Sequence, residues 1–109
     1  MKRLLSLSLI TAVILPVTAI ANTLPKNDFE FVLWGSGGGN AVLLCELISS
    51  REISLTDGLR WRNSLIPPSK NSRNNKILQF GFNEGLATFD SKKENYYRKC
   101  AKLKFKNVD

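Results

Sequence analysis

The sequence predicts a mainly α-helical domain of three to four helices, stapled by one disulfide, behind an N-terminal signal peptide. Three observations support this prediction. An apolar segment directly follows Met1-Lys2-Arg3, most later apolar residues recur at helical spacing, and the 109-residue chain has two cysteines, Cys45 and Cys100. Its formal net charge is +7 and it contains no histidine, so the balance of charge favours anionic partners.

The N-terminal 21 residues have the features of an export signal. Leu4–Ala21 is apolar, contains Pro16 near its end, and finishes with Ala-Ile-Ala, the small-x-small pattern that signal peptidase needs. Cleavage after Ala21 would leave 88 of the 109 residues, carrying a net charge of +5 once Lys2 and Arg3 are gone. The alternative is a membrane anchor through uncleaved residues 4–21, because 18 mostly apolar residues nearly span a bilayer. We therefore expect a periplasmic or extracellular protein.

The two cysteines predict a single disulfide. An exported chain this short buries a small share of its surface and usually needs a covalent cross-link, and an even number of cysteines is typical of a disulfide framework. Only the pairing Cys45–Cys100 is available. A zinc site is the weaker alternative, because two thiols cannot complete a tetrahedral shell in a chain that lacks histidine.

Residues 22–34 are predicted to form a tail and an arm. Asn22–Asn27 is polar, while Asp28–Trp34 alternates apolar residues, which indicates a short strand. Because a single strand lacks a partner, an extended or short helical arm over the core is an equal alternative.

Residues 35–109 are predicted to form the helical domain. Gly35–Gly39 predicts a flexible turn, and Asn40 is suited to cap a helix over residues 41–48. A second helix over Asp57–Leu65, capped by Ser54 or Thr56, should end at Pro67-Pro68. In it, Trp61 is expected to be a core anchor.

The second half of the domain is predicted to contain a polar hinge and two further helices. The hinge is Ser69–Asn75, and Lys76–Phe89 follows as a helix, with a strand over Ile77–Phe82 as the alternative. Ser91 and Glu94 form a capping box for the final helix, which should turn Cys100 inward. Its apolar arc is expected to hold Tyr96, Tyr97, Cys100 and Leu103.

The glycine-rich segment invites a comparison with nucleotide-binding loops. The segment fails the dinucleotide pattern, because Asn40 stands at the third glycine position, so no nucleotide cofactor is expected. Ser36 also fails the nucleophile-elbow pattern, since Trp34 replaces its first glycine. A weaker expectation is a loop whose backbone amides hold a small anion, formed by Gly37, Gly38, Gly39 and Asn40.

The final helix carries the clearest functional signal. Its predicted outer face is a basic surface suited to an anionic membrane or polysaccharide, although a solvated face is the plain alternative. This surface comprises Lys92, Arg98, Lys99, Lys102 and Lys106. Trp61, between Arg60 and Arg62, could alternatively stack on a sugar or base. The carboxylates show no spacing that predicts convergence, although Glu46 is expected to be half-buried.

These observations predict a non-catalytic binding or structural protein that meets an anionic surface or another protein, with no cofactor and no metal. The alternative is a secreted effector that binds membrane surfaces or polyanions. A hydrolase is the remote alternative.

The chain also resembles short exported proteins of marine picocyanobacteria. The resemblance rests on Trp34-Gly35-Ser36, the glycine segment, a helix with one cysteine, Arg51-Glu52-Ile53-Ser54 and a late single cysteine. It covers roughly Phe31–Ser54 and Cys100. Some proteins of this kind are labelled cyclic-nucleotide phosphodiesterases, but this chain lacks the histidine and aspartate metal ligands of that enzyme class. The resemblance therefore implies an exported setting and no mechanism.

Overall fold

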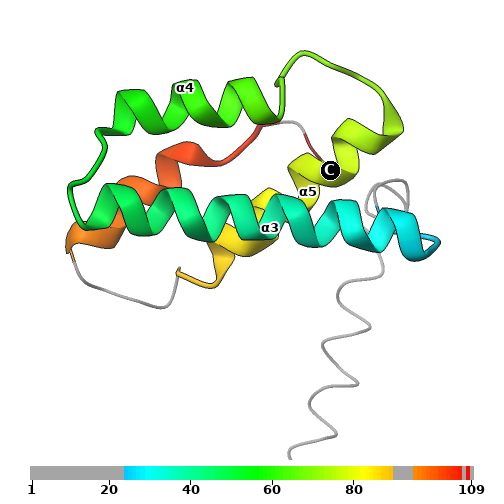
Figure 1. Ribbon diagram of the computed structural model, residues 1–109, viewed down its shortest axis with the longest axis horizontal. Coiled ribbons are helices and arrows are strands. Elements are labelled where there is room, and N and C mark those ends of the chain that lie inside the picture. Colours follow the sequence, from blue (N-terminus) through cyan, green and yellow to red (C-terminus); the bar gives the residue numbers. More distant parts are fainter. Residues whose placement is uncertain (1–23, 90–94, 107, 109) are drawn as a thin grey trace, which may run out of the picture.

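The computed structural model describes residues 24–89, 95–106 and 108, and this part of the chain is mainly helical (Figure 1). It contains three α-helices and one 3₁₀ helix, with no strand in the described ranges: α3 (Asp28–Ser49), α4 (Leu55–Leu65), α5 (Arg73–Ala87) and η1 (Asn95–Leu103). The predicted domain of three to four helices is confirmed. The predicted signal peptide and the Ser91–Glu94 capping box lie outside the described residues.

Helix α3 replaces the predicted arm, turn and first helix with one continuous element. It begins after Asn27, whose side chain accepts a hydrogen bond from the Glu30 N–H (2.9 Å), and runs for 22 residues. Asp28–Trp34 is thus helical, but it is not a separate arm. The predicted break at Gly35–Gly39 is also wrong. Isolated glycines would weaken a helix by about 1 kcal/mol each, so packing against a neighbouring helix must stabilise this one.

Glycines allow α3 and α5 to pack backbone against backbone where the two helices cross (Figure 1). A Cβ added to Gly37 would collide with the Leu78 carbonyl oxygen, and one added to Gly81 would collide with that of Trp34. A Cβ on Gly85 would lie 2.6 Å from the Gly38 oxygen. Because no side chain separates the helices here, the glycines that weaken each helix locally are required by the contact between them.

The core lies between the C-terminal half of α3, α5 and the C-terminal segment. Ala41, Leu44 and Cys45 of α3 are at most 1% exposed, and Phe82 of α5 is fully buried. The remaining core residues are Ile48, Ile66, Leu86, Phe89, Cys100, Leu103, Phe105 and Val108. Trp61 is not among them, because its side chain is 48% exposed, so the prediction of a core anchor is wrong.

The disulfide joins the first and last helices of the described chain. Cys45 of α3 is bonded to Cys100 of η1, with a Cα–Cα distance of 5.3 Å. This confirms the predicted pairing. Cys100 and Leu103 are both buried, as the predicted apolar arc requires, but the helix that carries them is 3₁₀ rather than α.

Local sequence signals correctly place the cap and the end of α4, but α5 starts three residues earlier than predicted. The Ser54 hydroxyl accepts a hydrogen bond from the Asp57 N–H (3.0 Å), and α4 ends just before the two prolines. α5 starts at Arg73, inside the predicted hinge, where the Ser72 hydroxyl caps the helix. The alternative strand over Ile77–Phe82 is therefore excluded.

Candidate anion-binding hollow

A surface hollow lies between α4 and the C-terminal segment. Its volume is about 320 Å³. Four of its seven lining residues are cationic and none is acidic: Leu59, Arg62, Pro68, Lys102, Lys104, Phe105 and Lys106. We call this feature the basic hollow. Positive charge gathered around a concave surface raises the local concentration of anions.

Two kinds of spacing bring these residues together. Leu59 and Arg62 lie three apart on α4 and therefore share one helix face. Along 102–106, buried and exposed side chains alternate, with Leu103 and Phe105 buried and the three lysines exposed. This alternation points the lysines away from the core while the two apolar residues anchor the segment.

Arg62 fixes the backbone of the C-terminal segment that lines the basic hollow. Its Nη1 donates hydrogen bonds to the carbonyl oxygens of Leu103 (2.6 Å) and Lys104 (3.4 Å), and Nε and Nη2 donate to Asn63 Oδ1. The guanidinium also lies 4.2 Å from the centre of the Phe105 ring, a cation–π contact. Burial lowers the pKa of Arg62, but an arginine stays protonated at neutral pH. Its main role is thus to fix the segment while adding one positive charge.

Asn83 of α5 fixes the same segment from the other side. Its Nδ2 donates to the Phe105 carbonyl oxygen (3.0 Å), and its Oδ1 accepts from the Phe105 N–H (2.8 Å). The Phe105 ring meets the Phe82 ring edge-to-face, with centroids 5.2 Å apart. These contacts hold the backbone between Lys104 and Lys106, so an anion would meet a lysine array whose backbone is already ordered.

The structure divides the predicted basic surface. Lys102 and Lys106 line the basic hollow, Arg98 and Lys99 are exposed but do not line it, and Lys92 lies outside the described residues. Arg62 and Lys104 were missed by the sequence analysis. The Lys-Leu-Lys-Phe-Lys alternation at 102–106 was a usable signal for Lys104, whereas Arg62 reaches the site only through the packing of α4.

The predicted anion-binding loop is wrong. Gly37, Gly38, Gly39 and Asn40 lie in the interior of α3, which begins at Asp28. Backbone amides in a helix interior donate to carbonyl groups four residues earlier and are not free to bind an anion.

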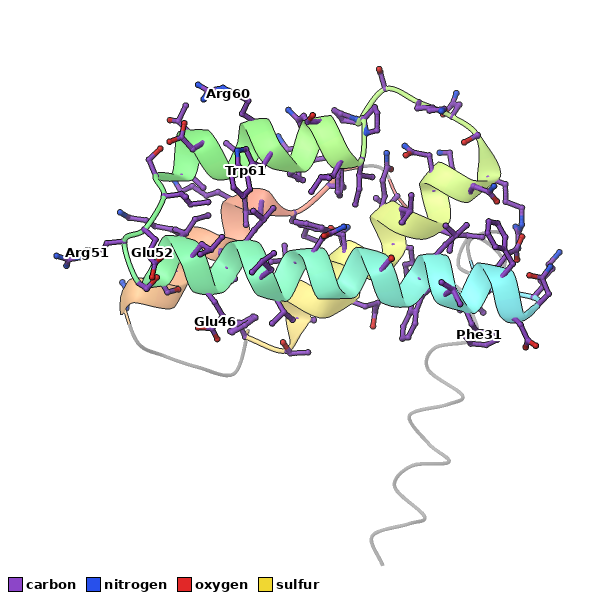
Figure 2. All side chains as sticks on the ribbon, in the orientation of Figure 1. Phe31, Glu46, Arg51, Glu52, Arg60 and Trp61 are labelled. Carbon is purple, nitrogen blue, oxygen red and sulfur yellow. A yellow bond between two sulfur atoms is a disulfide. The ribbon has the colours of Figure 1, made fainter. Side chains whose placement is uncertain are left out.

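Other candidate residues do not converge on a reactive site. Glu46 is exposed rather than half-buried, and Trp61 lines a separate, apolar hollow with Leu43, Leu44 and Leu65, together with Asn40 and Ser64. Figure 2 shows Arg60 projecting away from α3 on the outer side of α4, where it pairs with Asp57 at 2.7 Å. Among the described residues, no group of three or more His, Cys, Asp or Glu side chains could hold a metal ion.

Comparisons with protein-family models, curated proteins and solved structures gave no match to this chain. In the described part of the chain, α3 is long and apolar enough to cross a membrane by length and composition alone. Core helices of soluble proteins and signal sequences share these properties. The disulfide favours an oxidising compartment.

Proposed function

We propose that this protein is an exported, non-catalytic binding protein that captures a polyanion in the basic hollow. The observation that carries the proposal is the lining of the hollow, in which Arg62, Lys102, Lys104 and Lys106 stand together and no described lining residue is acidic. The apolar N-terminal segment and the disulfide support export, because disulfides persist in oxidising compartments.

The ordered backbone beneath the lysines also supports binding. Arg62 and Asn83 fix residues 103–105 before any ligand arrives, so binding orders only lysine side chains. The two ion pairs found among the described residues, Arg60–Asp57 and Arg73–Glu30, do not involve these lysines. The lysines can therefore meet an external anion without breaking either pair.

The test compares two variants of equal charge. In K104Q/K106Q the basic hollow loses two cations, whereas K26Q/R51Q removes two exposed cations that do not line it. Heparin serves as the polyanion, and titration calorimetry at several salt concentrations gives the affinity. K104Q/K106Q should bind roughly tenfold more weakly and show a shallower dependence on salt, because fewer counterions are released.

K26Q/R51Q should bind nearly as tightly as the wild type. An equal loss of affinity in both variants would show that net charge, and not the hollow, governs binding, and would refute the proposal. Vesicles of anionic phospholipid, titrated in parallel, distinguish a soluble polyanion from a membrane surface.

A further inference from the structure

The outer face of α3 is an apolar surface that nothing within the described chain covers. Four large apolar side chains on this helix are more than half exposed: Phe29 (59%), Phe31 (55%), Val32 (65%) and Leu43 (53%). Trp61 and Leu65 of α4 extend this surface beside Leu43. Figure 2 shows Phe31 and Glu46 projecting from α3 on the side away from α4. Phe29 stands apart from this surface, because residues two apart on a helix point in directions about 200° apart. Large exposed apolar patches on soluble proteins mark interaction sites.

One stripe runs along the middle of this face. Its six residues are spaced 4, 3, 4, 3 and 4 apart, which keeps them on one side of a helix, and all six are exposed: Asp28, Val32, Gly35, Gly39, Val42 and Glu46. We call it the outer stripe. Its two acidic ends are 18 residues, or about 27 Å, apart. Between them the outer stripe carries no charge.

The two glycines of the outer stripe differ from the glycines that face α5. A Cβ added to Gly37 would collide with the α5 backbone, but one added to Gly35 or Gly39 would meet nothing within 4 Å. Each outer glycine weakens the helix by roughly 1 kcal/mol relative to alanine, and no contact among the described residues accounts for it. In the contact between α3 and α5, glycines on α3 allow the backbone of another helix to approach closely.

We propose that the outer stripe is the interface of a homodimer, in which the α3 helices of two copies cross at Gly35 and Gly39. The outer stripe is symmetric in sequence about Gly37. Val32 and Val42 lie five residues before and after it, and Gly35 and Gly39 lie two residues before and after it. In an antiparallel pair, Val32 of one copy therefore meets Val42 of the other, and glycine meets glycine. Such self-complementarity is what a two-fold symmetric interface requires.

The available area fits a dimer. Phe31 and Trp61 are each about half exposed, so together they offer roughly 240 Å² of aromatic surface to a partner. The exposed parts of Val32, Val42, Leu43 and Leu65 bring the total to roughly 600 Å² per partner, the lower end of the range that specific interfaces bury.

The distribution of charge favours a second copy over an anionic membrane. α3 contains no lysine or arginine, and the outer stripe ends in two acids, which an anionic bilayer would repel. The lysines of the basic hollow are contributed by the C-terminal segment, so the positive charges of two copies need not meet at this interface.

The acidic ends do not prevent pairing. The two acids of each helix lie about 13 Å along the helix from the crossing point. At that distance, two helices that cross at roughly 40° are more than about 10 Å apart. That separation exceeds the Debye length of about 8 Å at physiological salt.

Sedimentation velocity on the oxidised, signal-free protein tests the proposal across a concentration series. The wild type should shift from monomer to dimer as concentration rises. G35L/G39L, which fills the crossing point, should raise the dimer dissociation constant at least tenfold. T56L/N74L places two leucines at exposed positions on α4 and α5, away from the outer stripe, and should dimerise like the wild type.

A second variant separates dimerisation from folding. G35A/G39A should melt at a higher temperature as a monomer, because alanine is the better helix former, yet should dimerise more weakly. Two results would each overturn the proposal. They are a wild type that stays monomeric at all concentrations, whether or not its α3 inserts into neutral lipid vesicles, and a dimer that G35L/G39L does not weaken.

Discussion

Replacing Gly81 by alanine should destabilise the fold even though alanine is the better helix former. The new Cβ would collide with the Trp34 carbonyl oxygen and would lie 2.8 Å from the Trp34 carbonyl carbon and 3.0 Å from its Cα. Carbon atoms pack at about 3.5–4.0 Å, so α3 and α5 must separate by roughly 1 Å. All three colliding atoms belong to the backbone, which leaves no side chain that can rotate out of the way.

The expected change in the free energy of unfolding is the difference between two opposing effects. Overpacking a tight contact costs about 1–3 kcal/mol, and a collision with three backbone atoms belongs to the upper part of that range, about 2–3 kcal/mol, while the gain in helix propensity returns about 1 kcal/mol. The net loss of roughly 1–2 kcal/mol corresponds to a fall in Tm of about 5–15 °C for a domain of this size. Gly39→Ala is the matched control, since its Cβ meets nothing within 4 Å, and it should raise the Tm by about 4–8 °C.

Thermal unfolding followed by circular dichroism at 222 nm measures both variants. The lowest practical protein concentration should be used, so that dimerisation does not contribute. If the two alanine variants shift the Tm in the same direction, the reasoning about backbone contact between α3 and α5 is wrong.

Three further predictions follow from the ion pair, the disulfide and the signal peptide. Hydrogen bonds from Arg73 (2.8 and 2.9 Å) and from the Lys26 N–H lower the pKa of Glu30 from 4.5 to about 2. The ionised carboxylate therefore stabilises the fold fully above pH 4.5, and this stabilisation is lost as the pH falls toward 2. The Tm of E30Q should therefore lie below that of the wild type at pH 7 and approach it near pH 2; a constant difference over this range would contradict the assignment. The free energy of unfolding of C45A/C100A, measured with urea, should be about 4 kcal/mol lower, because the bond closes a loop between residues 55 apart and so restricts the unfolded chain. An unchanged urea midpoint would rule out a stabilising role for the bond. Intact mass spectrometry of the exported protein should show a start at Asn22, and a species that retains Met1 would instead indicate an anchored form.

Local signals were sufficient to predict several features correctly. Ser54 caps α4 and the two prolines follow its end, because a cap acts through a hydrogen bond three residues away and proline restricts only its neighbours. The pairing of Cys45 with Cys100 could be predicted without knowledge of the structure, since no other cysteine is present. Helical spacing also correctly predicted α5 and the inward position of Leu103.

Features that depend on distant partners could not be predicted in this way. Gly37 and Gly38 look like loop residues until Gly81 and Gly85 are placed against them, because only the contact with α5 explains their presence in a helix. The exposure of Trp61 and the position of Arg62 beside Lys104 likewise depend on where α4 lies on the rest of the molecule.

The sequence by itself determined the helical class, the single disulfide, the cap of α4 and the excess of positive charge. These follow from composition and from interactions within a few residues. Only the tertiary structure decided that the glycine segment lies within the longest described helix, that part of the positive charge lines a hollow, and that one face of α3 is left uncovered. The physical reason is that helix propensities of about 1 kcal/mol per residue are smaller than the packing energy gained when two helices bring their backbones together.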